Sequence, residues 1–136
     1  MKTAILLLAL GCATAPRGEL YNRPAATAAR VQVIELGWNA IEDPQVGHPP
    51  IEDVKSPKRY RGLVLDEAEN LAAQCNQGQT PFETLMRGSV NEGSPEPVAV
   101  APQSKLAYRD AALRLHVGEC AMVEGPSADY VVKRLE

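Results

Sequence analysis

The stretch that decides the fold lies mid-chain, where residues 65–83 read LDEAENLAAQCNQGQTPFE. In its first part, apolar side chains recur at steps of three and four residues, which is typical of one face of an α-helix. This stripe consists of Leu65, Ala68, Leu71, Ala72 and Cys75. Gly78 follows, and glycine is a common residue just after a helix C-terminus. We therefore predict a helix over residues 65–77.

A second, shorter helix is predicted directly after this glycine. Thr80 can cap its N-terminus, Pro81 suits the first helical position, and Glu83 completes a capping box with the threonine. Phe82, Leu85 and Met86 would then face the core. The two helices would form a connected pair whose apolar side chains must pack against a sheet.

Strands are predicted on both sides of this pair. Residues 30–38 are rich in β-branched side chains, and residues 98–101 form a short apolar run. Residues 120–124 and 129–134 flank the turn 125–127, which reads Gly-Pro-Ser, and they indicate a hairpin. A third helix is predicted over residues 104–115.

The resulting order is strand, helix, helix, strand, helix, strand, strand. We therefore predict the α+β class, with a small four-stranded, mainly antiparallel sheet and three to four helices packed around it. The 136 residues suffice for one domain. The formal net charge of −3 argues against nucleic-acid binding, which needs a strongly basic surface.

The cysteines and histidines do not predict a metal site. His48 and His116 lie far apart, and no pair of cysteines or histidines has the spacing of metal ligands. We expect neither a metal nor a cofactor. Cys75 and Cys120 have two open interpretations, a disulfide or two buried free thiols.

The N-terminus predicts export. Lys2 precedes an apolar run over residues 4–10, which is too short for a membrane span but suits a secretory signal. Cys12, directly after a glycine, resembles the lipidated cysteine of a lipobox. Ordinary secretion, with cleavage near Ala13 or Ala15, is the alternative.

This interpretation divides the chain into a signal peptide over residues 1–11, a lipidated Cys12 with a flexible tether over residues 12–29, and a domain over residues 30–136. The tether is rich in Ala, Pro and Thr. Because Ala13 rather than aspartate follows the cysteine, resemblance to Gram-negative sorting rules favours the outer membrane, facing the periplasm. The expected location is the cell envelope, with the membrane contacted through the lipid.

Residues 39–62 form a predicted long loop, because four prolines and two glycines interrupt any regular element. The loop carries Lys55, Lys58, Arg59 and Arg61, which either are solvated or bind a partner. Trp38, just before it, has two interpretations as well: edge packing or a platform for a ligand.

Several segments of residues 30–136 resemble the parvulin-type (rotamase) peptidyl-prolyl isomerases. The segment from Glu67 to Leu85 is similar to that family's first two helices, and residues 108–119 to its third helix and the Gly-Glu that follows. Residues 128–134, which read ADYVVKR, are similar to the family's last strand. The order of elements matches too.

The resemblance implies functional positions. In that family, two histidines and an acid or cysteine line the polar floor of the site that binds the prolyl bond. The last-strand histidine falls on Tyr130, and the acid or cysteine falls near Glu92. The first-strand histidine falls within residues 31–33, where this chain has no histidine. We therefore predict Glu92 and Tyr130 as catalytic residues. The family's apolar pocket positions fall on Val98, Leu106 and Tyr108.

Three hypotheses follow for the function. The first is an envelope lipoprotein that binds proline-containing segments of exported proteins as a foldase or chaperone, with weak or lost isomerase activity. The second is a non-catalytic binding or assembly subunit with the parvulin fold. The third is a structural lipoprotein without that fold.

Overall fold

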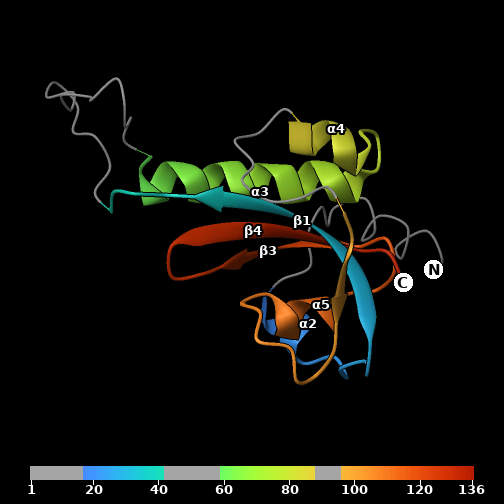
Figure 1. The fold of residues 1–136 in the computed structure, drawn as a ribbon. Helices are drawn as coiled ribbons and strands as arrows, with labels where there is room; N and C mark the ends of the chain where they lie inside the picture. The colour runs from blue at the N-terminus through green and yellow to red at the C-terminus, as the bar shows by residue number, and fades with distance from the viewer. Residues whose placement is uncertain (1–16, 42–58, 88–95) are drawn as a thin grey trace, which may run out of the picture.

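The computed structural model describes residues 17–41, 59–87 and 96–136. Its helices and strands follow the predicted order after one additional short helix at the N-terminal end (Figure 1). In chain order they are α2 (Arg17–Tyr21), β1 (Ala29–Gly37), α3 (Arg61–Gln77), α4 (Phe82–Arg87), β2 (Val98–Val100), α5 (Arg109–Ala112), β3 (Cys120–Glu124) and β4 (Ala128–Arg134).

The described residues form one four-stranded sheet with the order β2-β1-β4-β3. Each of its three strand pairs is antiparallel. The longest ladder joins β1 to β4, from Val31 opposite Arg134 to Gly37 opposite Ala128. The two strands expected to carry the functional positions are therefore direct neighbours at the centre of the sheet.

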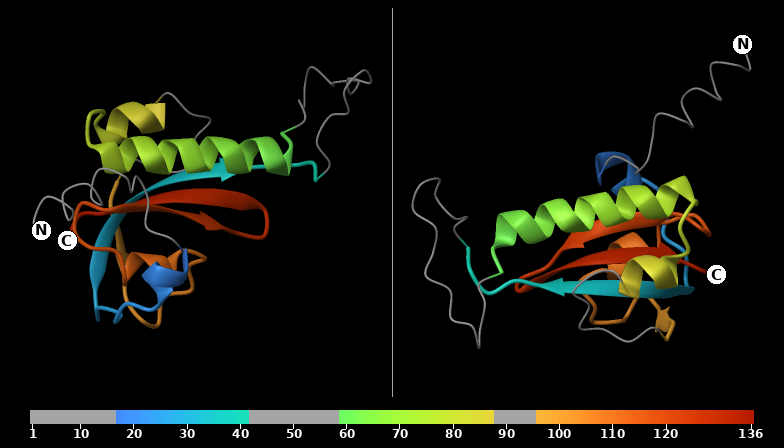
Figure 2. Two further views of the ribbon diagram at one scale, coloured as in Figure 1. Left: turned by 180° about the vertical axis from the view of Figure 1, so that it is seen from behind. Right: turned by 90° about the horizontal axis from the view of Figure 1, so that it is seen from above.

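Helices cover both faces of this sheet (Figure 2). Helices α3 and α4 lie on one face, and α2 and α5 lie on the other. Two hydrophobic clusters result, and β1 contributes alternate residues to them: Val31 and Val33 to one, Ile34 and Leu36 to the other. Burial on both faces explains why β1 carries buried apolar residues on both of its sides rather than only at every second position.

Helix α3 is longer than predicted, because it begins at Arg61 instead of Leu65. Tyr60 pairs with Ala40 in a parallel bridge, and the backbone N–H of Arg61 donates to the carbonyl of Ala40 at 2.8 Å. This anchor lets the helix start four residues earlier, so that Gly62 belongs to the helix and not to the loop. The predicted buried stripe is correct except that Val64 replaces Leu65. The predicted end at Gly78 is confirmed, with φ +74°.

The third predicted helix is much shorter than residues 104–115, because α5 spans only Arg109–Ala112. The Ser104 hydroxyl accepts a hydrogen bond from the backbone N–H of Ala101 at 2.9 Å, and the Ser104 N–H donates to the Ala101 carbonyl at 3.0 Å. Ser104 thus closes a turn instead of capping a helix, a competing use of serine side chains.

The flexible tether expected over residues 12–29 is wrong from Arg17 onward. Leu20 of α2 is 3% exposed and belongs to the core cluster. The Arg23 guanidinium contacts both carboxylate oxygens of Glu119, with Nη2 donating to Oε2 at 3.2 Å. The backbone N–H of Ala26 donates to the Leu113 carbonyl at 2.7 Å. The folded domain therefore includes residues 17–29, and not only residues 30–136.

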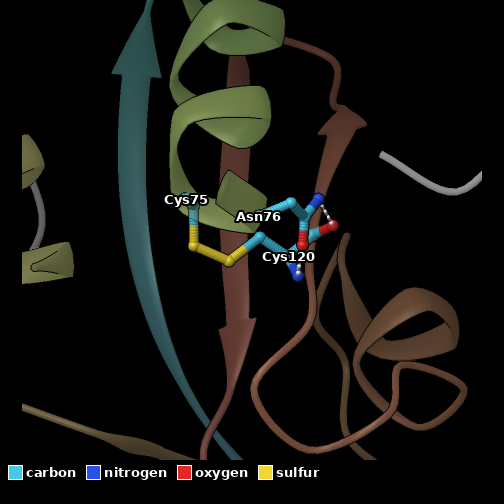
Figure 3. Close-up of a disulfide and its surroundings, with 3 residues drawn as sticks. All are labelled: Cys75, Asn76 and Cys120. Carbon is cyan, nitrogen blue, oxygen red and sulfur yellow. Dashed lines mark hydrogen bonds between the residues drawn. A yellow bond between two sulfur atoms is a disulfide. The ribbon is translucent and has the colours of Figure 1, made fainter. Parts of the chain in front are cut away.

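A disulfide joins Cys75, near the end of α3, to Cys120 at the start of β3 (Figure 3), which resolves the open question about these cysteines. The Cα atoms are 6.1 Å apart, within the range that a disulfide spans. Asn76 reinforces the junction, because its side-chain amide donates to the Cys120 carbonyl at 2.9 Å and accepts from the Cys120 N–H at 2.8 Å. The helix is thereby fastened to the sheet by one covalent and two hydrogen bonds.

Candidate functional site

Tyr130 lies near the middle of the sheet, on the face that α2 and α5 cover. In the ladder between β4 and its neighbours it is opposite Glu35 of β1 and Val123 of β3. Directly opposed residues of antiparallel strands point to the same face. The side chains of Glu35 and Tyr130 therefore emerge side by side.

Of the three predicted substrate-binding residues, Tyr108 packs against Tyr130, and Val98 and Leu106 pack against the same hydrophobic cluster. The rings of Tyr108 and Tyr130 are tilted by 54°, with their centroids 5.4 Å apart, a geometry that aromatic pairs favour. Val98 of β2 lies opposite Val31 of β1, and Val98, Leu106 and Tyr130 all pack, partly buried, against the cluster that contains Tyr108. We call Glu35, Val98, Leu106, Tyr108 and Tyr130 the Tyr130 cluster.

Gly125 sets the position of the Tyr130 ring. A Cβ atom at residue 125 would lie 2.8 Å from Cε2 of Tyr130 and 2.8 Å from the carbonyl oxygen of Ala128. Only glycine leaves room for such an approach. The turn between β3 and β4 thus packs its backbone against the ring, a contact that turn chemistry in the sequence does not reveal.

Burial and nearby acids keep both tyrosines protonated. Burial is the main cause of the raised pKa of Tyr130, and the charges of Glu35 and Asp129 raise it further. Burial also raises the pKa of Tyr108, with further contributions from Tyr130 and Glu35. Since the ordinary tyrosine pKa is already about 10, both hydroxyls are neutral hydrogen-bond donors at physiological pH.

Glu35 is the residue of this site that sequence reasoning missed. The family's first-strand histidine position was expected within residues 31–33, but the register sets Val33 opposite Val132 and Glu35 opposite Tyr130. The alternation of β1 was visible in the sequence, whereas its pairing with β4 was not. If β1 were shifted by two residues along β4, each side chain would stay on the same face of the sheet but lie opposite a different residue. The alternation pattern alone therefore could not identify Glu35 as the residue opposite Tyr130.

The other candidates lie elsewhere. Glu92 and Cys12 fall outside the described residues, as do Lys55 and Lys58. His116 is 74% exposed and lies in the turn before β3. Trp38 packs against the cluster on the opposite face, with the Arg61 guanidinium carbon 5.3 Å from its ring centroid. This arrangement favours packing over a ligand platform for Trp38.

No helix among residues 17–41, 59–87 and 96–136 has both the length and the apolar character of a membrane span. Within the same ranges, no three His, Cys, Asp or Glu side chains come together as metal ligands could.

The Tyr130 cluster combines three kinds of group. Val98 and Leu106 offer apolar surface, the two tyrosines offer protonated hydroxyls, and Glu35 offers a carboxylate.

Comparison with known proteins identifies the fold. No family model matches the chain, and no curated protein sequence matches it either. A solved structure, the peptidyl-prolyl isomerase ESS1 from Candida albicans, is similar with a TM-score of 0.59 and 19% sequence identity, over 84% of this chain and 67% of that chain. The predicted α+β, parvulin-like fold is thereby confirmed, and the hypothesis of a structural lipoprotein without that fold is wrong.

Proposed function

We propose that this protein binds proline-containing segments of exported proteins and catalyses their cis–trans isomerisation weakly, at the Tyr130 cluster. One observation supports the proposal: within a parvulin fold, Glu35 and Tyr130 lie opposite each other where β1 and β4 pair, Tyr108 packs against the Tyr130 ring, and Val98 and Leu106 pack against the hydrophobic cluster on the same face. Three of these residues, Val98, Leu106 and Tyr108, occupy positions that the family resemblance associates with the proline pocket.

Prolyl isomerisation requires no covalent step on the protein. Rotation about an X-Pro bond crosses a barrier of roughly 18–20 kcal/mol, and no bond to the substrate has to form. A catalyst must bind the twisted amide better than the planar one. In the twisted state the amide loses resonance, so its nitrogen becomes a better hydrogen-bond acceptor. We assign the Tyr130 hydroxyl as the donor, held protonated by burial and by the charge of Glu35.

A non-catalytic binding subunit is the second candidate, and one observation favours it. The resemblance implies a pair of histidines on the first and last strands, whereas this chain has Glu35 and Tyr130 opposite each other there. Burial raises the pKa of Tyr130 above its ordinary value, so its hydroxyl gives up its proton poorly at neutral pH. We therefore expect any rate acceleration to come from hydrogen bonding and desolvation, and to be modest.

A protease-coupled isomerisation assay on the full chain separates the two candidates. The substrates are Ala-Xaa-Pro-Phe peptides that differ in the residue before proline. A rate above the uncatalysed background, reduced in Tyr130→Phe, is expected for the enzyme. If no peptide isomerises faster than background while some still bind in a titration, the binding subunit is the correct interpretation.

We further propose that the protein resides in the cell envelope through a lipid on Cys12. The sequence of residues 1–12 motivates this, and the Cys75–Cys120 disulfide is consistent with an oxidising compartment. Cys12→Ser is expected to move the protein from the membrane pellet to the soluble fraction. Retention of the Cys12→Ser variant in the pellet would contradict the anchor.

A further inference from the structure

The folded domain begins close to the proposed lipid site. Residues 13–16 separate Cys12 from Arg17, the first residue of α2. Because an extended chain spans at most ~3.6 Å per residue, Arg17 lies within about 18 Å of Cys12. Leu20 of α2 is buried in the core cluster, so α2 moves with the domain. A lipid on Cys12 would therefore hold the α2 side of the domain near the membrane surface.

The turn of residues 116–119, which leads from α5 to β3, lies beside the end of α2. The Glu119 carboxylate accepts hydrogen bonds from the guanidinium of Arg23, two residues after α2. The same carboxylate accepts the backbone N–H of His116 at 2.9 Å. The short tether thus brings this turn, as well as α2, near the membrane. We call Tyr21, His116 and Val117 the α2 surface.

The α2 surface exposes apolar side chains. Val117 is 65% exposed and Tyr21 is 43% exposed. Aromatic and apolar side chains of this kind suit the boundary between lipid head groups and acyl chains. The nearby acids Glu19 and Glu119 both form ion pairs with Arg23, which offsets their repulsion from anionic lipids.

We infer that the α2 surface contacts the lipid bilayer, so that the domain is docked on the membrane and not suspended from it. The inference rests on the lipid at Cys12 put forward under the proposed function, and it adds the orientation of the domain. Because the tether is short, contact between the domain and the bilayer is an intramolecular event with a high effective concentration. A small apolar contact is then sufficient.

The test uses the full chain, lipidated on Cys12 and reconstituted into vesicles of phosphatidylethanolamine and phosphatidylglycerol. An environment-sensitive fluorophore is attached to His116→Cys, which keeps Val117 and the backbone donor to Glu119. Leu63→Cys carries the same fluorophore as the matched control, because Leu63 is also 54% exposed but belongs to α3, across the sheet from α2 (Figure 2). We expect spin-labelled lipid to quench the probe at residue 116 and not the probe at residue 63. Iodide in the aqueous phase should do the reverse.

Two variants assign the contact to Val117. Val117→Asp is expected to abolish the quenching of the residue 116 probe by lipid, because a charged side chain is costly to transfer out of water. Ile41→Asp is the control, because it makes the same change at an apolar side chain that is 71% exposed, next to the bridge between Ala40 and Tyr60. It should leave the quenching unchanged.

The outcomes separate this inference from the proposal on which it rests. Equal quenching by lipid at residues 116 and 63, or quenching at residue 116 that survives in Val117→Asp, would overturn the inference and leave the lipid anchor standing. If mass spectrometry of the chain extracted from membranes finds no lipid on Cys12, the proposed anchor itself fails.

Discussion

Glu35 of β1 and Tyr130 of β4 lie directly opposite each other in the central ladder of the sheet, and Tyr108 packs against the ring of that tyrosine with a centroid separation of 5.4 Å. This relationship places a carboxylate and two protonated hydroxyls on a mostly apolar face. Tyr130 falls where the family resemblance implies a histidine. The tyrosine keeps a hydrogen-bond donor at this position, but it does not titrate near neutral pH.

Removing the Tyr130 hydroxyl should slow isomerisation without changing the fold. Tyr130→Phe keeps the ring, and so the contacts with Tyr108 and Gly125. We expect the rate enhancement to fall about fivefold, which corresponds to one neutral hydrogen bond of about 1 kcal/mol. Magnetisation exchange between the cis and trans signals of an Ala-Ala-Pro-Phe peptide measures this rate. Tyr21→Phe, on the exposed side of α2, is the control, and an unchanged enhancement in Tyr130→Phe would remove this residue from the mechanism.

Alkaline pH should reveal the raised pKa of Tyr108 and Tyr130. The folded protein holds these protons more tightly than the unfolded chain does. The contribution of these two tyrosines to the free energy of unfolding is therefore constant below about pH 10, the ordinary tyrosine pKa. It falls as the pH rises through the pKa values of the two tyrosines in the folded protein. A pH titration followed by tyrosinate absorbance measures the pH at which these tyrosines ionise. Ionisation of these two tyrosines below pH 10 would contradict the prediction.

Gly125 is expected to matter for the site and not only for the turn. Gly125→Ala brings a Cβ atom to 2.8 Å from both the Tyr130 ring and the Ala128 carbonyl oxygen. Relief of this overlap must move the ring or the turn, at a cost of about 1–3 kcal/mol, and peptide affinity should fall with it.

Gly78→Ala is the comparison for that variant. Its added Cβ meets nothing within 4 Å, although φ is +74°, so it should lower stability by roughly 1 kcal/mol through the backbone alone. Chemical denaturation and peptide titration measure the two effects. Equal peptide affinity in both glycine variants would show that Gly125 has no special role at the site.

Arg23→Ala should destabilise the whole domain. The carboxylate of Glu119 is 21% exposed and Arg23 is 15% exposed. Burial alone would raise the pKa of Glu119, but hydrogen bonds from Arg23 and from the His116 backbone lower it below its ordinary value. Loss of the arginine leaves a partly buried charge without this partner, at a cost of about 1–3 kcal/mol.

Arg30→Ala provides the control, because its pair with Glu136 is long at 3.9 Å and both side chains are more than half exposed. Thermal unfolding of the two variants should differ clearly, with Arg30→Ala close to the parent protein. Similar unfolding temperatures for the two variants would mean that the Arg23–Glu119 contact stabilises the domain no more than the exposed Arg30–Glu136 pair does.

Breaking the Cys75–Cys120 disulfide should cost about 2–4 kcal/mol. The bond links residues 45 apart in the sequence, and its loss restores chain entropy to the unfolded state. Guanidinium unfolding with and without a reductant measures the difference, and the Cys75→Ala/Cys120→Ala double variant should reproduce the reduced protein. A reductant effect that persists in the double variant would assign the loss of stability to something else.

Local pattern predicted most of the secondary structure. The helical stripe from Ala68 to Cys75, the stop at Gly78 and the hairpin around Gly125 are signals that neighbouring residues carry, and the structure confirms them. The errors occurred where distant contacts overrule local preference. Ala40 extends α3 toward its N-terminus, and Leu113 and Glu119 hold a segment whose composition resembles a flexible linker.

By itself the sequence determined the fold class and the order of elements, because hydrophobic periodicity and turn residues act over a few positions. Only the tertiary structure decided that Glu35 is opposite Tyr130, that Gly125 lies against its ring, and that Cys75 meets Cys120. The physical reason is strand register: residues nearly a hundred positions apart are brought together by packing on both sides of the sheet, and no local pattern encodes which of several equivalent alignments buries the core best.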